Sequence, residues 1–173
     1  MPPHCDTMDG PVVTAARKAL EKENVNIILP WVHKKFEDEV KSSFEKTISV
    51  GKLGKEAKDL ADIWFFETVV RLHREGEGAP YTGLKPAGLD EGPVIPMVEV
   101  AIEEEDTTDI IDFLAGEIND EMEKMMKEIV SLKEYDIDDV GTAREYIDAM
   151  LELTLYSHHL YECIKSGPKH GAE

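Results

Sequence analysis

Residues 11–32, PVVTAARKALEKENVNIILPWV, and residues 93–114, PVIPMVEVAIEEEDTTDIIDFL, decide the fold because the second stretch repeats the pattern of the first. The two stretches align with a constant offset of 82 residues, so that their first prolines coincide and Ala19 meets Ala101. Hydrophobic residues and chain breaks coincide over about 60 residues, although few residues are identical. This agreement predicts an internal duplication.

The correspondence resumes near the end of each half, where FFETVVRLH falls on MLELTLYSH with an offset of 85 residues. We therefore predict a single domain, residues 1–173, that contains an internal repeat. The two copies span residues 11–76 and 93–165, and a loop of residues 77–92 joins them.

Both halves place apolar residues at helical spacing, and no alternating apolar pattern is long enough to predict a sheet. We expect the first half to form four helices, at residues 11–23, 25–32, 34–50 and 55–74. The second half should repeat this order from Pro93, and its last helix should run from Val140 to Lys165. The predicted fold is all-α: a helical bundle of two duplicated four-helix halves with pseudo-twofold symmetry.

The loop of residues 77–92 is long for a connection in a compact domain. It contains Tyr81, Leu84 and Leu89, apolar residues that a plain flexible linker would not need. We expect an ordered loop that packs on the bundle and partly buries Tyr81. A flexible linker is the alternative.

The chain is acidic, with 37 Asp and Glu residues against 19 Lys and Arg residues and a net charge of −18. This charge disfavours nucleic acid and anionic membranes as partners, because both are negatively charged. No apolar run reaches the length of about 18 residues that a membrane-spanning helix needs. The sequence identifies no small-molecule ligand and leaves a homo-oligomer open.

Cys5 and Cys163 are the only cysteines, which is too few for a disulfide scaffold and typical of a reduced compartment. The start of the sequence lacks a basic region followed by an apolar stretch, so no signal peptide is expected in the chain as written. We therefore expect a cytoplasmic protein, or an exported one if a signal peptide has been removed.

Three candidate metal ligands follow one another near the start: His4, Cys5 and Asp6. Thiolate and imidazole groups suit zinc, copper or iron. Adjacent residues do not readily all bind one tetrahedral ion, so further ligands should come from elsewhere. A helical wheel places His73 and His158 on the apolar sides of their helices, and the two histidines are repeat equivalents. We predict a site where the N-terminal arm folds back to both histidines.

The same residues have another interpretation. A lone histidine on an apolar helix face is usually a hydrogen-bonded core residue. Asp6, Thr7 and Asp9 would then cap the first helix, and Cys5 would be a small apolar plug. Both interpretations stay open at the level of the sequence.

Two repeat-equivalent carboxylates, Glu67 and Glu152, fall on polar sides of their helices and are expected at the surface. Glu67 should form an i to i+4 ion pair with Arg71. The sequence lacks the Glu and Glu-x-x-His set of di-iron bundles, a phosphate-binding glycine loop, a nucleophile elbow and a CxxC pair. It therefore assigns no catalytic residue.

Three stretches resemble a family of uncharacterised prokaryotic proteins: HCDTMDGPVV, NVNIILPWV and FFETVVRLHREGEGAPYTGLKPAG, which ends in HREGEGAPYTGLKPAG. The resemblance extends over almost the whole chain and implies no activity, because the family has no assigned function. In similar proteins HCD follows a signal-like leader, which implies export. The matching motif positions are His4, Cys5, Asp6, His73, Arg74, Glu75, Gly76 and Glu77.

Two functions remain open from the sequence. One is a metal-binding all-α protein, of which a metal-dependent oxidoreductase is one form, with a zinc, copper or iron ion between the HCD arm and the central helices. The other is a non-enzymatic structural or protein-interaction module without a metal.

Overall fold

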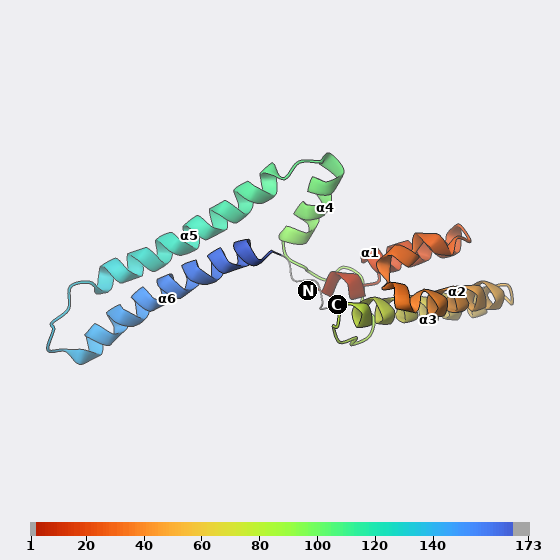
Figure 1. The fold of residues 1–173 in the computed structure, drawn as a ribbon, viewed down its shortest axis with the longest axis horizontal. Coiled ribbons are helices and arrows are strands. Elements are labelled where there is room, and N and C mark those ends of the chain that lie inside the picture. The colour runs from red at the N-terminus through yellow and green to blue at the C-terminus, as the bar shows by residue number, and fades with distance from the viewer. Residues whose placement is uncertain (1–2, 168–173) are drawn as a thin grey trace. The chain divides into compact units, whose positions relative to one another are not determined.

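The computed structural model describes residues 3–167, which form six α-helices and four short 3-10 helices, with no β-strand in that range. The predicted all-α class is confirmed. The chain divides into two compact units (Figure 1): the first ends at Glu91 and the second begins at Gly92. No helix in the described range is both long and apolar enough to cross a membrane.

The first unit contains three α-helices: α1 (Pro11–Glu21), α2 (Glu37–Gly51) and α3 (Lys55–Gly76). Four 3-10 helices accompany them: η1 (Pro3–Asp6), η2 (Val25–Ile27), η3 (Leu29–Trp31) and η4 (Lys34–Phe36). Pro11 lies in the first turn of α1, where its missing N–H costs nothing. The side chain of Asn24 accepts a hydrogen bond from the backbone N–H of Asn26 and caps η2, as the sequence predicted.

The core of the first unit is built around α3, which contributes more buried residues than either α1 or α2. Phe65, Phe66 and Val69 of this helix are almost inaccessible to solvent. Phe65 contacts Phe44 of α2 edge to face, with ring centroids 5.8 Å apart. Val12 and other small residues of α1 complete this core.

The second unit contains α4 (Val94–Glu104), α5 (Thr108–Leu132) and α6 (Val140–Ser166). Two separate helices were expected where α5 is continuous, and this expectation is wrong. In the first unit Pro30 has no backbone N–H to donate and so prevents a continuous α-helix. At the equivalent position of α5 the residue is Asp112, which has this donor. The helix therefore continues through this point.

The equivalent positions of the two halves do not all have equivalent surroundings. Ala19 and Ala101 are both buried. His73 is partly buried in the first unit, whereas His158 is exposed on the second. The duplication and its pseudo-twofold symmetry stay predictions.

The loop between α3 and α4 packs on the first unit, as expected. Tyr81 and Leu84 are partly buried against the core, although Leu89 is exposed. The loop also pairs with the start of the chain, because the backbone N–H of Lys85 donates to the carbonyl of Asp6 at 2.8 Å. This pairing fixes the position of the N-terminal residues around Asp6.

Candidate functional site

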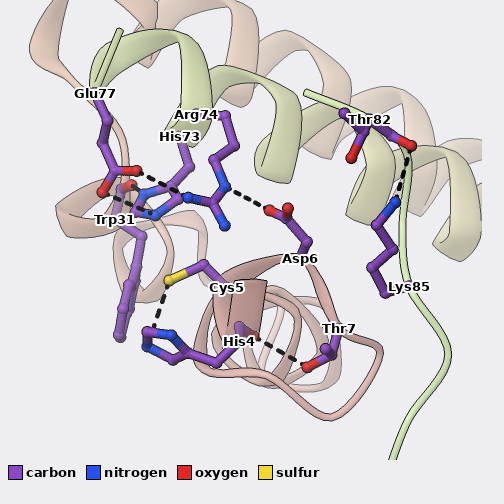
Figure 2. Close-up of polar contacts among 10 residues, drawn as sticks. All are labelled: His4, Cys5, Asp6, Thr7, Trp31, His73, Arg74, Glu77, Thr82 and Lys85. Carbon is purple, nitrogen blue, oxygen red and sulfur yellow. Dashed lines mark hydrogen bonds and ion pairs between the residues drawn. The ribbon is translucent and has the colours of Figure 1, made fainter. Parts of the chain in front are cut away.

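The N-terminal arm, residues 3–10, lies against the C-terminal end of α3 and the following loop (Figure 2). The backbone N–H of Met8 donates to the carbonyl of Lys85 at 3.0 Å, which completes the pairing described above. The carboxylate of Asp9 accepts a hydrogen bond from the backbone N–H of Gly88 at 2.7 Å. This bond lowers the pKa of Asp9 because it favours the charged form. The arm is thus held by the loop through backbone and side-chain contacts.

Asp6 and Arg74 form a buried ion pair between the arm and α3. Nε of Arg74 donates to Oδ1 of Asp6 at 2.6 Å, and the two side chains are 5% and 6% exposed. Burial disfavours the charge on Arg74, but the hydrogen bond to Asp6 and its negative charge outweigh burial and raise the Arg74 pKa. Asp6 is therefore engaged by a cation of the protein itself.

Cys5 is buried beside this ion pair and is 5% exposed. Its Sγ lies 3.6 Å from Nε2 of His4. Burial raises the pKa of the thiol to about 11, with a further contribution from the negative charge of Glu77, while Arg74 acts in the opposite direction. Cys5 is consequently a protonated thiol at neutral pH, and without a metal ion it is a poor nucleophile.

His73 has a fixed ring orientation at the C-terminal end of α3. Its Nδ1 lies 2.6 Å from the carbonyl oxygen of Trp31, and because a carbonyl only accepts, Nδ1 carries the hydrogen. In the neutral ring Nε2 then holds a lone pair. This atom lies 3.3 Å from Oε1 of Glu77, so two acceptors face each other. A proton or another cation between them would make this contact attractive.

Three buried polar atoms around the arm have no hydrogen-bond partner within the described part of the chain: Nδ1 of His4, Nε2 of His73 and Oε2 of Glu77. The last of these lies 3.6 Å from Nη1 of Arg74, an ion pair that is too long for a hydrogen bond. An unpartnered buried polar atom costs about 1–3 kcal/mol, which calls for a water molecule or an ion. Within residues 3–167, no group of three or more His, Cys, Asp or Glu residues is arranged so that it could hold a metal ion. The potential ligands instead form two pairs, His4 with Cys5 and His73 with Glu77.

The structure brings four of the five predicted metal ligands into the first unit: His4, Cys5, Asp6 and His73. The fifth, His158, lies on α6 in the second unit, where it is exposed and its ring centroid is 6.1 Å from that of His159. The expectation of a buried His158 is wrong for this unit. The helical wheel placed His158 on the apolar side of α6, and His158 is exposed there.

The capping interpretation of the arm is wrong for the residues that it named. The N-cap of α1 is Gly10, without a side-chain hydrogen bond. Asp6 pairs with Arg74 and Asp9 with the backbone of Gly88. The apolar-plug interpretation of Cys5 is consistent with its place in the core of the first unit.

Sequence reasoning missed Glu77 as a partner of His73. The signal was present in HREGE, because residues four apart on a helix share a face. The structural role of Arg74 left no comparable signal, since its partner Asp6 lies 68 residues earlier.

Comparison with known protein families matches residues 9–156 to a family of unknown function. The chain belongs to this family, DUF6448. No curated protein and no solved structure matches it. The match to DUF6448 includes His73, Arg74 and Glu77 and begins after His4, Cys5 and Asp6.

The raised pKa of Cys5 predicts slow alkylation of the DUF6448 protein by iodoacetamide. At pH 8, in a Cys163→Ser variant, we expect Cys5 to react at least about 100-fold more slowly than a free cysteine, because little thiolate is present. Mass spectrometry measures the rate, and unfolding in urea should restore ordinary reactivity. The same shift in the pKa of Cys5 stabilises the fold below pH 9.0, the ordinary pKa of the thiol, and this contribution should be lost as the pH rises toward about 11. Rapid labelling of the folded variant would contradict the burial of Cys5.

Proposed function

We propose that this DUF6448 protein binds one transition metal ion, zinc, copper or iron, where the N-terminal arm meets the end of α3. The ligands are Cys5, His4, His73 and Glu77. The observation that supports this proposal best is the contact between Nε2 of His73 and Oε1 of Glu77 at 3.3 Å. Two buried acceptors facing each other are stabilised by a cation between them, and imidazole and carboxylate are both common metal ligands.

The hydrogen bond between His73 and Trp31 supports a metal ligand rather than an ordinary core histidine. Metal-binding histidines usually donate their other ring N–H to a carbonyl or carboxylate, which fixes the tautomer and the ring orientation. Nδ1 of His73 makes this contact with the carbonyl of Trp31, and Nε2 is left with its lone pair. The ring is therefore oriented in advance for a ligand at Nε2.

The distances within the two pairs suit tetrahedral coordination. Ligand atoms bound at about 2.0–2.3 Å to one tetrahedral ion lie roughly 3.3–3.6 Å from each other. Sγ of Cys5 and Nε2 of His4 are 3.6 Å apart, and Nε2 of His73 and Oε1 of Glu77 are 3.3 Å apart. Binding would require the two pairs to approach each other. We propose that a change of side-chain rotamer in the arm, at His4 and Cys5, provides this movement.

The proposed ligand set differs from the set predicted from the sequence. Asp6 is replaced by Glu77, because Asp6 is bound closely to Nε of Arg74 at 2.6 Å, whereas Glu77 has Oε2 3.6 Å from Nη1 of Arg74 and Oε1 directed at Nε2 of His73. His158 is replaced by His4 as the second imidazole, and the site lies wholly within the first unit. Coordination would also lower the pKa of Cys5, because a bound metal stabilises the thiolate.

The identity of the ion determines which chemistry follows. A copper or iron ion would supply one-electron chemistry, the basis of an oxidoreductase, whereas zinc has no redox chemistry. In either case this chain would contribute a thiolate, two imidazoles, of which His73 is oriented by Trp31, and a carboxylate in a largely buried site. The metal content of the purified protein therefore also tests the oxidoreductase form of the proposal.

Metal analysis of protein purified without a histidine tag tests the proposal. We expect about one zinc, copper or iron ion per chain, and a loss of at least ten-fold in metal affinity in Cys5→Ser and in His73→Ala, since each removes one ligand. His158→Ala and Cys163→Ser are matched controls and should bind metal as the unchanged protein does. An unchanged protein that takes up none of the three ions would refute the proposal, as would equal losses in the controls.

A non-enzymatic role without a metal is the second candidate, and one observation favours it. The Asp6–Arg74 pair and the backbone bonds of Lys85 hold the arm in place without any ligand. In this case water would satisfy the buried atoms of His4, His73 and Glu77. The same assay separates the two candidates, because only the metal-binding function predicts stoichiometric uptake.

A further inference from the structure

A cavity of about 430 Å³ lies between α2 and α3, and Tyr81 of the following loop also lines it. Its lining residues run from Glu39 to Lys46 on α2 and from Trp64 to Arg71 on α3. They recur every three or four positions, so they occupy one face of each helix. The volume is within the range of about 300–1,000 Å³ that is typical of small-molecule sites. None of these residues belongs to the proposed metal site.

Two contacts between α2 and α3 determine which residues of the cavity lie opposite each other. At one end, Nη2 of Arg71 donates to Oε1 of Glu39 at 2.5 Å. At the other end, Nζ of Lys46 lies 5.7 Å from the centroid of the Trp64 ring, which is a cation–π contact. Residue numbers rise along α2 and fall along α3 between these contacts, so the helices are antiparallel. Glu67 is therefore about one turn away from Lys46 along the groove.

Two opposite charges in this cavity have no ionic partner. Among residues 3–167, the ion pairs of the structure include neither Lys46 nor Glu67. The charge of Arg71, by contrast, is balanced by Glu39 and Glu75. Lys46 and Glu67 thus present one positive and one negative charge to a molecule in the cavity. This pattern is complementary to a zwitterion, a small molecule that carries one carboxylate and one ammonium group.

Tyr81 adds a buried polar group without a partner to the same cavity. Its hydroxyl is inaccessible to solvent and has no hydrogen-bond partner within the described residues. Burial raises the pKa of Tyr81 and the negative charge of Glu67 raises it further, while the backbone of Leu84 acts in the opposite direction. The hydroxyl is therefore close enough to Glu67 for that charge to act on it. Buried hydroxyl groups usually have a partner, and a polar group of a bound molecule would supply one here.

The groove between α2 and α3 continues beyond Lys46 and Trp64 as an apolar hollow of about 330 Å³. Lys46 and Trp64 line both the cavity and this hollow, so the two adjoin at these residues. The remaining residues of the hollow are Thr47, Val50, Leu60 and Ala61. The groove therefore has a charged part and an apolar part, with the half-exposed indole of Trp64 between them.

We propose that the groove between α2 and α3 binds a free α-amino acid with an apolar side chain. Lys46 binds the carboxylate of this ligand, and Glu67 binds its ammonium group. The apolar side chain lies over the indole of Trp64 and in the adjoining hollow, where its burial adds affinity. The proposal does not depend on the metal site, because the groove shares no residue with it.

Isothermal titration calorimetry of the full chain with L-leucine, leucinamide and N-acetyl-leucine tests the proposal. Leucinamide lacks the carboxylate and N-acetyl-leucine lacks the ammonium group, while both retain the side chain. We expect one leucine to bind per chain. Each analogue should bind about ten-fold more weakly, because it leaves one charged group of the groove without its hydrogen-bond partner.

Two variants assign each ligand charge to its residue. Glu67→Gln should weaken leucine and leucinamide about ten-fold and leave N-acetyl-leucine unchanged, since only the first two carry an ammonium group. Lys46→Gln should weaken leucine and N-acetyl-leucine and leave leucinamide unchanged. Both residues are exposed, so the variants should fold, which circular dichroism checks. Lys41→Gln and Glu45→Gln are matched controls on α2 outside the groove and should leave all three affinities unchanged.

Two results would overturn the proposal. The first is that leucine, methionine and phenylalanine all fail to show saturable binding at concentrations up to about 10 mM. The second is that the control variants lose as much affinity as Glu67→Gln and Lys46→Gln, because the overall charge of the protein would then explain the losses.

Discussion

Asp6→Asn is expected to lower the free energy of unfolding of the first unit by about 3–5 kcal/mol, the usual effect of breaking a buried ion pair. The substitution removes the carboxylate charge on Nε of the Arg74 side chain, which is 5% exposed, and leaves it with the more distant carboxylate of Glu77 at 3.6 Å. Chemical unfolding followed by tryptophan fluorescence measures this change. Trp31 and Trp64 are the only tryptophans and both lie in the first unit, so the signal is specific for it.

The ion pair between Arg71 and Glu39 supplies a matched control for this prediction. Its two side chains are 42% and 51% exposed, although the closest N–O distance is 2.5 Å. Exposed ion pairs contribute only about 0–1 kcal/mol, because water and salt screen them. Glu39→Gln should therefore change stability by less than about 1 kcal/mol. An Asp6→Asn variant no less stable than Glu39→Gln would mean that the arm is not anchored by this pair.

Gly10→Ala is expected to displace the N-terminal arm. A Cβ atom on Gly10 would lie 1.9 Å from the carbonyl oxygen of His4 and 2.8 Å from Oγ1 of Thr7. The backbone of Gly10 is extended, with φ of −69°, which alanine also adopts, so the destabilisation by Gly10→Ala is steric. We expect the free energy of unfolding of the first unit to fall by about 3 kcal/mol, at the upper end of the usual cost of overpacking. In the Cys163→Ser background, alkylation of Cys5 should accelerate at least ten-fold, since the thiol becomes exposed.

Gly116→Ala is the natural comparison for this substitution. A Cβ atom at Gly116, within α5, would meet no atom within 4 Å. Because alanine favours a helix interior over glycine by roughly 0.5–1 kcal/mol, this variant should be as stable as the unchanged protein or slightly more stable. Unchanged Cys5 alkylation in Gly10→Ala would show that the arm can adapt to the extra methyl group.

Much of the fold was predictable because local signals agree with it. Pro11 begins α1, Asn24 caps η2, and the break at Gly54 separates α2 from α3. The continuous α5 was missed because the alignment transferred the interruption of the first half to the second. Pro30, which causes that interruption, has no counterpart proline. A repeat alignment therefore conveys hydrophobic pattern better than it conveys chain breaks.

The candidate site was predictable only in part, because its decisive contacts join residues far apart in the chain. The return of the arm toward His73 was expected, since the arm contains the densest group of ligand residues. The partner of Arg71 was not predicted correctly. Helical spacing indicated Glu67, but Arg71 pairs with Glu39 of α2 and with Glu75. Helical spacing names possible neighbours on the same helix, and tertiary packing decides between them and residues of other helices.

The length of chain between Asp6 and Arg74 has a consequence for synthesis. The two residues are 68 positions apart, so the arm cannot dock until Arg74 has been added. At about 5–20 residues per second, translation leaves an interval of roughly 3–14 s between them. Until the arm docks, Cys5 lacks the cover that leaves it only 5% exposed after folding. Ions and oxidants thus have their easiest access to this thiol while the polypeptide is still growing on the ribosome.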